Sequence, residues 1–360
     1  MNAIEVSAPG KLLLIGEYVV LDGAPALVMA VDRRVDVRIG QADDGAGRLT
    51  APQLGIRQAE MRIEDGQLRC GGVRPGALGL TGRLIPAIMR ALGRAPEEVE
   101  TLDIEIDSGA LFESHAGASV KLGLGSSAAV CAALAVGLGD WFAGSMDEAY
   151  AGDRLDRWLP VYRRALGARA SGADLGAAFF GGFNLFRSAG DRAECKPVAW
   201  PETLCWRAVW TREAAQTTDF VGAFDAWKRR DPSGAAGILT RAGEIAQHAS
   251  ANADNGRALL EACRAYAGAM EELGRAMGLD IMTAPHRRLA DLGRQCGVVY
   301  KSCGAGGGDL GIALASDPDR LRAFETGVSD RGGVPLNLAI SKSGAGRARR
   351  RVSETGKEIQ

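Results

Sequence analysis

The chain has 360 residues, of which 46% are hydrophobic and 24% charged, and its formal net charge is −1. This is the profile of a soluble globular protein with two domains or one large one, and it argues against general binding to nucleic acid or membranes. Seven scattered cysteines without a CxxC pair, and only three histidines, argue against a zinc site and favour reduced thiols in a cytoplasm. The first residues lack a signal-peptide pattern, and no run of about 18 apolar residues predicts a membrane span.

Strand patterns dominate the first half of the chain. Alternation of apolar and polar residues, or a short buried apolar run, predicts strands at residues 4–8, 12–15, 35–39 and 102–106. Apolar residues on both sides of the turn Asp22-Gly23 indicate a hairpin, and residues 40–75 are expected to form an antiparallel edge region with long loops. Helices are expected over residues 80–92 and, from a run of small apolar residues, over 128–136.

Helical patterns dominate the second half. Helices are predicted at residues 155–170, in several long segments within 217–275, and at 285–296 and 317–327. Short strands are predicted at residues 183–186, 208–210 and 336–340, and apolar segments at residues 298–302 and 310–315 flank the last glycine-rich turn. Because the character of the sequence changes near residue 190, we expect an N-terminal domain over residues 1–190, a C-terminal domain over 191–345 and a solvated basic tail over 346–360.

A glycine- and serine-rich turn comes directly before the helix expected at 128–136, and Lys121 stands just ahead of it. The residues of this turn are Gly123, Leu124, Gly125, Ser126, Ser127 and Ala128. Glycines let the main chain approach a ligand closely, and the amides of a helix N-terminus attract anions, most often phosphate. The serine hydroxyls could bind phosphate oxygens or a magnesium ion. The alternative is an ordinary loop–helix junction with serine N-caps, and the order of residues fits neither a Walker A loop nor a dinucleotide fingerprint.

Two further glycine-rich turns lie far away in the sequence, at residues 9–17 and 302–309. Three such turns indicate a ligand site, because each costs backbone entropy. Asp174 is the leading candidate carboxylate, since it could orient a hydroxyl or take its proton, and its alternative role is a helix N-cap. Glu17 and Asp309 could equally be turn residues that bond their own backbone. Lys121 and the arginines between residues 154 and 169 could simply be solvated.

The three turns resemble the three motifs of the GHMP kinase superfamily, in the same order and spread over most of the chain. Residues 8–18 resemble motif one, residues 123–128 resemble motif two, which is the ATP phosphate loop, and residues 302–309 resemble motif three.

Within the superfamily the chain is most similar to the phosphomevalonate kinases. Tyr18 follows Gly-Glu where mevalonate and galactose kinases usually have histidine, and Lys121 precedes the phosphate loop. Asp174 ends a Ser-Gly-x-Asp motif, and the long match of residues 304–314 to motif three points the same way.

The resemblance implies an α+β, two-domain GHMP kinase fold. The N-terminal domain would be similar to domain 2 of ribosomal protein S5, the C-terminal domain would be ferredoxin-like, and ATP and substrate would lie in the cleft between them. The implied activity is the ATP- and Mg²⁺-dependent phosphorylation of 5-phosphomevalonate to 5-diphosphomevalonate by a cytoplasmic monomer or homodimer without nucleic-acid or membrane partners.

The resemblance also implies roles for individual residues. Lys121 and Asp174 would be catalytic, residues 123–128 would bind ATP, and Ser127 would be a magnesium ligand. The residues implied to bind the substrate are Lys11, Glu17, Tyr18, Ser171, Gly172, Gly306, Gly307 and Asp309.

One departure from the family pattern bears on the substrate. Mevalonate kinases carry a glutamate ligand for magnesium about one helix before the catalytic aspartate, whereas this chain has Arg163-Arg164 there. The departure argues against a mevalonate kinase and leaves the carboxylate ligand of the metal open. The alternatives are another GHMP small-molecule kinase, acting on mevalonate or a sugar, and a non-catalytic ligand sensor of this fold.

Overall fold

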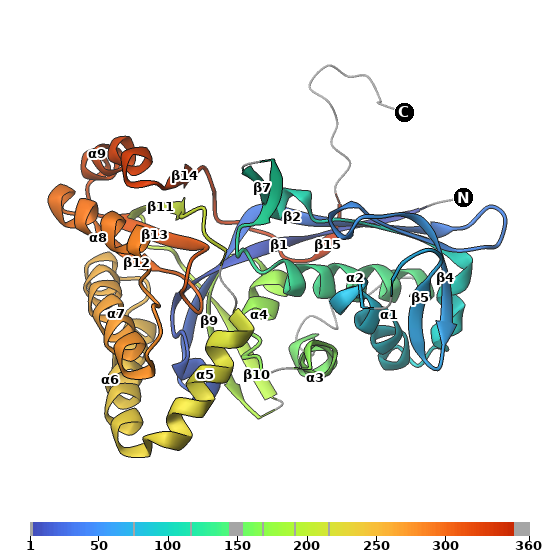
Figure 1. Cartoon of the computed structure of the whole chain (residues 1–360), viewed down its shortest axis with the longest axis horizontal. Helices are drawn as coiled ribbons and strands as arrows, with labels where there is room; N and C mark the ends of the chain where they lie inside the picture. The colour runs from blue at the N-terminus through green and yellow to red at the C-terminus, as the bar shows by residue number, and fades with distance from the viewer. Residues whose placement is uncertain are drawn as a thin grey trace.

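A computed structural model describes residues 3–348 except 75, 116, 144–153, 168, 191 and 215–216. The described residues form a nine-stranded sheet, a four-stranded sheet and a separate two-stranded hairpin, with helices against both sheets (Figure 1). The α+β class expected from the sequence is confirmed.

The large sheet is built mainly from the first half of the chain. Its strands are β1 (Ile4–Ile15), β2 (Ala26–Gln41), β3 (Arg48–Ala51), β4 (Ile56–Glu64), β5 (Gln67–Cys70), β6 (Leu102–Asp107), β9 (Phe183–Ala189), β10 (Arg192–Val198) and β15 (Gly346–Arg347). Their order is β10-β9-β2-β6-β3-β4-β5, and β1 pairs with both β2 and β15. The β3–β6 pair is parallel, whereas the other pairs recorded in this sheet are antiparallel.

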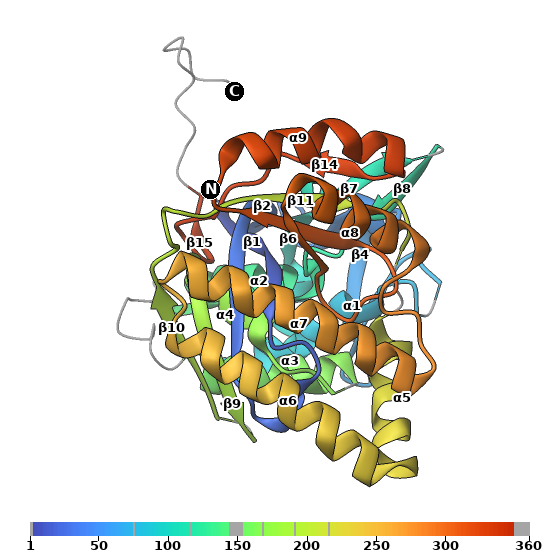
Figure 2. The ribbon, with the colours of Figure 1, turned by 90° about the vertical axis from the view of Figure 1, so that its left-hand side faces the viewer.

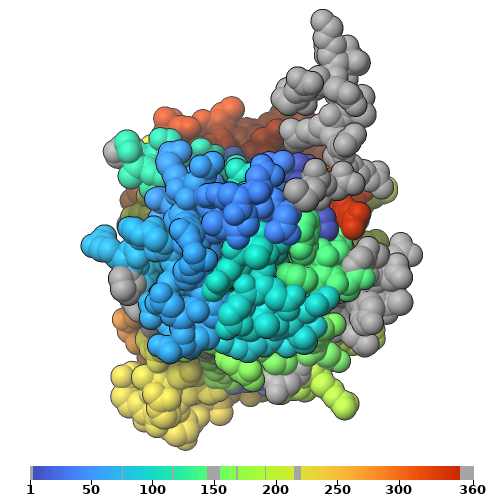
Figure 3. Space-filling view, turned by 90° about the vertical axis from the view of Figure 1, so that its right-hand side faces the viewer, coloured from blue at the N-terminus to red at the C-terminus, as the bar shows by residue number. Residues whose placement is uncertain are grey.

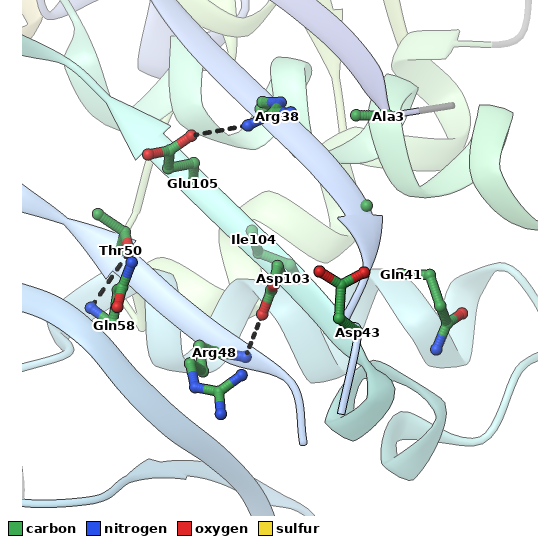
Figure 4. A pocket seen from close by; sticks show the side chains of 11 residues that line it. Ala3, Arg38, Gln41, Asp43, Arg48, Thr50, Gln58, Asp103, Ile104 and Glu105 are labelled. Carbon is green, nitrogen blue, oxygen red and sulfur yellow. Dashed lines mark hydrogen bonds and ion pairs between the residues drawn. The ribbon is translucent and has the colours of Figure 1, made fainter. Parts of the chain in front are cut away.

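Alternation along the strands separates a buried face of this sheet from a polar one. In β6, Leu102, Ile104 and Ile106 are buried, whereas Asp103 and Glu105 are exposed. Figure 4 shows the polar face, where side chains of β2, β3, β4 and β6 line a shallow hollow and form mutual hydrogen bonds and ion pairs. Figure 3 shows the end of the molecule where β4 and β5 lie. Much of the surface in this view is blue and cyan, so it belongs to the first third of the chain.

Four helices cover the buried face of the large sheet (Figures 1 and 2). They are α1 (Gly79–Ala91), α2 (Ser126–Ala143), α3 (Arg154–Leu166) and α4 (Ala173–Phe180). Helix α2 lies against β1 and β2, and its residues Ala128 to Asp140 are buried. By length and composition α2 could cross a membrane, but 67% of it is buried inside the protein, as in the core helix of a globular domain.

The small sheet has the order β12-β13-β11-β14 and is antiparallel throughout. Its strands are β11 (Cys205–Trp210), β12 (Val299–Ser302), β13 (Leu310–Ala315) and β14 (Val334–Leu336). Of the five helices described in this half of the chain, α7, α8 and α9 contact its strands and α5 and α6 pack against α7; Figure 2 shows α6 and α7 side by side. The helices are α5 (Thr217–Arg230), α6 (Pro232–Ala251), α7 (Gly256–Met277), α8 (Ala284–Cys296) and α9 (Pro318–Val328).

A short hairpin leads into the phosphate-loop segment. It consists of β7 (Phe112–His115) and β8 (Ala118–Lys121), and the ring of His115 lies edge-on against Trp210 of the small sheet, with centroids 5.6 Å apart. Short 3₁₀ turns occupy Val19–Asp22, Pro52–Leu54, Pro96–Thr101, Gly109–Leu111 and Ser329–Arg331.

Several predicted elements differ from the structure. Residues 9–11, expected as a turn between the strands at 4–8 and 12–15, lie inside the single strand β1. The arm before Asp22-Gly23 is a 3₁₀ turn rather than a strand. Strand β1 ends at Ile15, and Gly16 and Tyr18 beyond it have φ values of 111° and 64°. The helix expected to reach residue 170 ends at Leu166, before Gly167 with a φ of 65°. The last predicted strand is shorter and earlier, since β14 ends at Leu336 and Ile340 forms only an isolated bridge with Val31.

The chain crosses between the two sheets more than once. Strands β9 and β10 form one hairpin of the large sheet, so the expected boundary after residue 190 falls inside that hairpin. After β14 the chain returns, and β15 pairs with β1. We therefore propose that the N-terminal unit extends to Val198 and also includes β15.

Candidate functional site

The first glycine-rich turn lies directly on the phosphate-loop segment. The Lys11 amide in β1 donates to the Leu124 carbonyl over 2.8 Å, and a Cβ on Gly10 would come within 2.9 Å of that oxygen. The Lys11 ammonium reaches along the loop and donates to the Gly123 carbonyl over 3.5 Å. A glycine at residue 10 is thus needed for β1 to support the loop, and the same strand delivers a lysine to it.

The third glycine-rich turn closes on the other two. A Cβ on Gly123 would overlap the Asp309 carboxylate, so glycine is required where the phosphate loop meets the turn at residues 302–309. The Tyr18 hydroxyl donates to the Ala305 carbonyl over 2.5 Å. Segments about 100 to 290 residues apart in the sequence therefore meet at one place.

The phosphate loop has the conformation that its glycines suggest. Gly123 and Gly125 have φ values of 76° and 75°, in the region that favours glycine. Helix α2 then begins at Ser126. The first amides of a helix lack partners within it, and the helix dipole favours an anion at this end. Ser126 and Ser127 are half-buried and Lys121, at the end of β8, is exposed. This arrangement suits a phosphate group next to lysine side chains.

Asp174 lies in the first turn of α4 and is not its N-cap. The cap position is Gly172, with a φ of 92°. The Asp174 carboxylate accepts hydrogen bonds from the Tyr162 hydroxyl over 3.0 Å and from the Leu175 amide over 2.9 Å. Helix α4 packs against α2. Burial, and then the negative charge of Asp174, raise the pKa of the Cys131 thiol in α2. The alternative role as an N-cap is wrong, and Asp174 keeps lone pairs for a ligand.

Glu17 belongs to a buried ion pair that the sequence did not suggest. The Lys301 ammonium donates over 2.6 Å to Glu17 Oε1 and over 2.6 Å to the Ser302 carbonyl, and the side chains of Glu17 and Lys301 are 2% and 1% exposed. Glu17 Oε1 also accepts from the Gly304 amide over 3.3 Å, and the Tyr266 hydroxyl donates to the Glu17 carbonyl over 2.7 Å. Although burial opposes it, Glu17 raises the pKa of Lys301 and keeps it charged.

This pair joins the first turn to the third, so Glu17 is engaged with protein rather than open to a substrate. The signal that could have found it is Lys301 itself, an isolated lysine between two apolar segments directly before the glycine run.

The other residues expected to bind substrate hold loops in place. The ring of Tyr18 lies 5.0 Å from that of Phe224. A Cβ on Gly306 would collide with Ile281, and one on Gly307 would overlap the ring of Phe220 in α5. These glycines allow close packing of the third turn against its neighbours.

The arginine-rich segment before Asp174 is partly structural rather than only a solvated face. The Arg163 guanidinium donates to the carbonyls of Ala170 over 2.9 Å and Ser171 over 3.1 Å. Arg157 donates to the Ala91 carbonyl over 2.7 Å, whereas Arg164 is exposed. Arg163 thereby fixes the loop that leads to Asp174, and Ser171 is part of this contact.

The donor set fits a metal ion held mainly by phosphate. Among the described residues, no group of three or more His, Cys, Asp or Glu side chains could hold a metal ion. Mg²⁺ usually binds through one or two carboxylates together with phosphates and water. The Ser127 hydroxyl and the Asp174 carboxylate, on the adjacent helices α2 and α4, suit that mode.

Comparison with known proteins agrees with this geometry. Residues 82–182, which include the phosphate loop and Asp174, match the family model described as GHMP kinases N terminal domain. A phosphomevalonate kinase from Streptomyces sp. (strain CL190) is 29% identical over 85% of this chain and 88% of its own length. A mevalonate kinase from Thermococcus sibiricus is 25% identical over 94% of this chain and 96% of its own length.

Solved structures share the fold. A Lin0012 protein from Listeria innocua has a TM-score of 0.80 at 21% identity, covering 96% of this chain and 98% of its own. The Streptococcus pneumoniae phosphomevalonate kinase in complex with phosphomevalonate and AMPPNP has a TM-score of 0.73 at 20% identity, covering 94% of this chain and all of its own.

Proposed function

We propose that this chain, in which residues 82–182 match the GHMP kinase N-terminal family model and which shares the fold of solved GHMP kinases, is a phosphomevalonate kinase. It transfers the γ-phosphoryl group of ATP to 5-phosphomevalonate and yields ADP and 5-diphosphomevalonate. The observation that carries the proposal is the meeting of Lys11, Gly123 and Asp309 at the N-terminus of α2, in a chain similar over 85% of its length to a phosphomevalonate kinase.

In the proposed reaction, the protein has to neutralise negative charge on the phosphates more than it has to supply a general base. An oxygen of the acceptor phosphate attacks the γ-phosphorus, and the bond to the bridging oxygen of ADP breaks. Because a phosphate monoester is largely ionised at neutral pH, with a second pKa of about 6, the attacking oxygen needs little deprotonation. The protein has to bring two anions together in line and to stabilise the charge on the transferring group.

The phosphate loop supplies these functions from several directions. The amides at the start of α2, with Ser126 and Ser127, bind the β- and γ-phosphates of ATP. Lys11 supplies positive charge along the loop, and Lys121 reaches the transferring group from the end of β8. Ser127 and Asp174 would hold an Mg²⁺ ion bound with ATP, and the ion would supply charge neutralisation at the phosphates.

Asp174 orients the acceptor or the metal from the first turn of α4. Its hydrogen bond from the buried Tyr162 hydroxyl holds the carboxylate in one orientation. Glu17 and Tyr18 act on the substrate only through the turns that they hold.

A substrate panel tests the proposal. The protein is assayed by coupled ADP detection with phosphomevalonate, mevalonate, galactose and homoserine, each with ATP and Mg²⁺. We expect the highest kcat/KM with phosphomevalonate by at least about a hundredfold, as for a site built to recognise a charged group. A higher kcat/KM with any other acceptor contradicts the proposal.

Mevalonate is the second candidate acceptor, because relatives named mevalonate kinase match nearly the whole chain. The basic stretch Arg163-Arg164, near which the resemblance to mevalonate kinases implies an acidic metal ligand, favours the phosphorylated acceptor. A non-catalytic sensor is distinguished in the same assay, because it would bind ATP without acceptor-dependent release of ADP.

A further inference from the structure

His286 is a buried residue at the end of the third glycine-rich turn. It lies in the first turn of α8 and is 0% exposed. Its Nδ1 lies 2.9 Å from the Tyr300 hydroxyl oxygen. Its Nε2 lies 3.0 Å from the Gly308 carbonyl oxygen. A carbonyl oxygen can only accept, so Nε2 carries the proton and Nδ1 accepts from Tyr300. The two partners thus fix the tautomer of the ring.

The ring remains neutral at the pH of a cytoplasm. Burial lowers the pKa of His286 to about 4, and the charge of Lys301 acts in the same direction, against the opposing effects of the Gly308 carbonyl and Asp280. The Nε2–H donor is therefore present throughout the neutral range.

The peptide group that His286 contacts is held at both ends. Its carbonyl, on Gly308, accepts from His286, and its amide, on Asp309, donates to the Glu213 carbonyl over 2.7 Å. The next carbonyl, on Asp309, accepts from the amide and hydroxyl of Thr211 over 2.9 and 3.0 Å. These bonds stabilise Asp309 at a φ of 54°, which non-glycine residues rarely adopt.

The position of Asp309 matters for the phosphate loop. Its carboxylate occupies the space next to Gly123 that a Cβ would need. A rotation of the peptide between residues 308 and 309 would move this carboxylate relative to the loop.

We infer that His286 is a positioning residue for phosphoryl transfer, which holds the Gly308–Asp309 peptide and thereby sets the Asp309 carboxylate against Gly123 of the phosphate loop. It acts through that peptide and is not itself a catalytic residue. The inference rests on the proposed function, in which the phosphate loop binds ATP.

Replacing His286 by glutamine or by asparagine distinguishes a residue that positions the Gly308–Asp309 peptide from one that only fills space in the core. In His286→Gln the side-chain NH₂ can take the place of Nε2–H, whereas in His286→Asn it can reach only the place of Nδ1. We expect His286→Gln to keep kcat and the AMPPNP Kd within about threefold of wild type. We expect His286→Asn to lose about tenfold or more in kcat, the value of one hydrogen bond of about 1.4 kcal/mol.

A control in the same helix reports on packing alone. Leu289 is 0% exposed in the core beneath α8, and Leu289→Ala should lower Tm while leaving kcat and the AMPPNP Kd unchanged at a temperature where the protein is folded. Equal constants for the Asn and Gln variants overturn the inference. A loss in Leu289→Ala as large as that in His286→Asn also overturns it, because packing would then explain both.

The wild-type protein is measured first, so that the two proposals are judged separately. A wild type that does not bind AMPPNP contradicts the proposed function and the inference together. If it binds AMPPNP but prefers another acceptor, the variants are assayed with that acceptor. In that case only the proposed substrate is contradicted.

If the Asn variant does not accumulate as folded protein, ¹⁵N chemical shifts of His286 in the wild type decide. We expect a protonated Nε2 and an unprotonated Nδ1 at pH 7. The opposite tautomer or a doubly protonated ring would overturn the inference.

Discussion

At the scale of single residues, the candidate site contains charged side chains that other parts of the protein hold in place or present at the loop. The Asp174 carboxylate is oriented by hydrogen bonds from the Tyr162 hydroxyl and the Leu175 amide. Lys11 lies along the phosphate loop, and Lys121 stands exposed at its entrance. Such preorganisation lowers the cost of placing charged groups at the reacting centre.

Lys121 is expected to stabilise the transition state more than the ground state. In Lys121→Ala we predict a loss of at least about 10²-fold in kcat, roughly 2.7 kcal/mol, with a much smaller change in ATP affinity. Lys121→Arg should recover only part, because a planar guanidinium does not replace a compact ammonium. Steady-state kinetics check this, and Lys196→Ala, which removes an exposed lysine of β10, is the control. A kcat within about twofold of wild type would exclude the role.

Asp174→Asn should preserve shape and remove charge. We predict that the variant folds and binds ATP but keeps less than about a tenth of the wild-type kcat, a loss above roughly 1.4 kcal/mol. Tyr162→Phe, which removes one hydrogen bond and leaves the charge, should lose less. If Asp174→Asn retains more than that tenth in a turnover assay, the carboxylate has only a structural role.

At the scale of elements, the glycines of the phosphate loop permit close contact with the first and third glycine-rich turns. Gly123 faces Asp309 and Gly125 faces Lys11, so the phosphate loop is confined between the first and third turns. The ion pair of Glu17 and Lys301 then ties those two turns together.

Gly125→Val is expected to disturb the phosphate loop in two ways. Gly125 has a φ of 75°, and a Cβ there would lie 2.9 Å from Lys11 Cγ. We predict at least about tenfold weaker ATP binding in calorimetry, since the loop and the lysine must both shift. Gly72→Val is the matched control, because Gly72 has a φ of 72° with no atom within 4 Å. Unchanged ATP affinity in Gly125→Val would mean that the loop does not cradle phosphate.

Lys301→Met should destabilise the protein strongly, because it leaves the Glu17 charge buried without its partner. We predict a loss of about 3–5 kcal/mol in the free energy of unfolding, measured by urea titration. The double variant Glu17→Gln with Lys301→Met should recover part of it, since neither charge then remains. Arg257→Ala breaks a pair with exposed side chains, to Glu261, and should have little effect. A double variant less stable than Lys301→Met would refute this account.

At the scale of the whole molecule, the C-terminal segment ties the small sheet back to the large one. The Arg34 guanidinium donates to the carbonyls of Ser343 and Gly344 over 3.0 and 2.8 Å, and the Ala345 amide donates to the Ala178 carbonyl over 2.7 Å. The segment thus lies against α4, the helix that carries Asp174.

Gly344→Ala tests this tie. A Cβ on Gly344 would overlap the carbonyl of Phe179 in α4, and backbone atoms cannot move aside as a side chain can. We predict a loss of about 1–3 kcal/mol in the free energy of unfolding and a fall in kcat as α4 shifts. Gly346→Ala, with no atom within 4 Å, should match the wild type in both measurements. Equal values for the two variants would contradict the prediction.

The sequence by itself determined the strands with alternating patterns and the glycine-rich turns as places of close approach, whereas the fold class was implied by the resemblance of those turns to a known family. The strands and turns depend on local periodicity and on the backbone freedom of glycine, which neighbouring residues in the chain already express. It also singled out Lys11, Lys121 and Asp174 as charges near those turns, whose catalytic roles stay predictions.

Only the tertiary structure decided which residues meet. Glu17 looked like a turn or substrate residue until its partner Lys301, 284 positions away, was placed beside it. No local sequence pattern pointed to His286, because its proposed role depends on a hydrogen bond to the Gly308 carbonyl in a loop outside its own helix. Pairings across such distances follow from how sheets and helices pack together, and no local pattern encodes them.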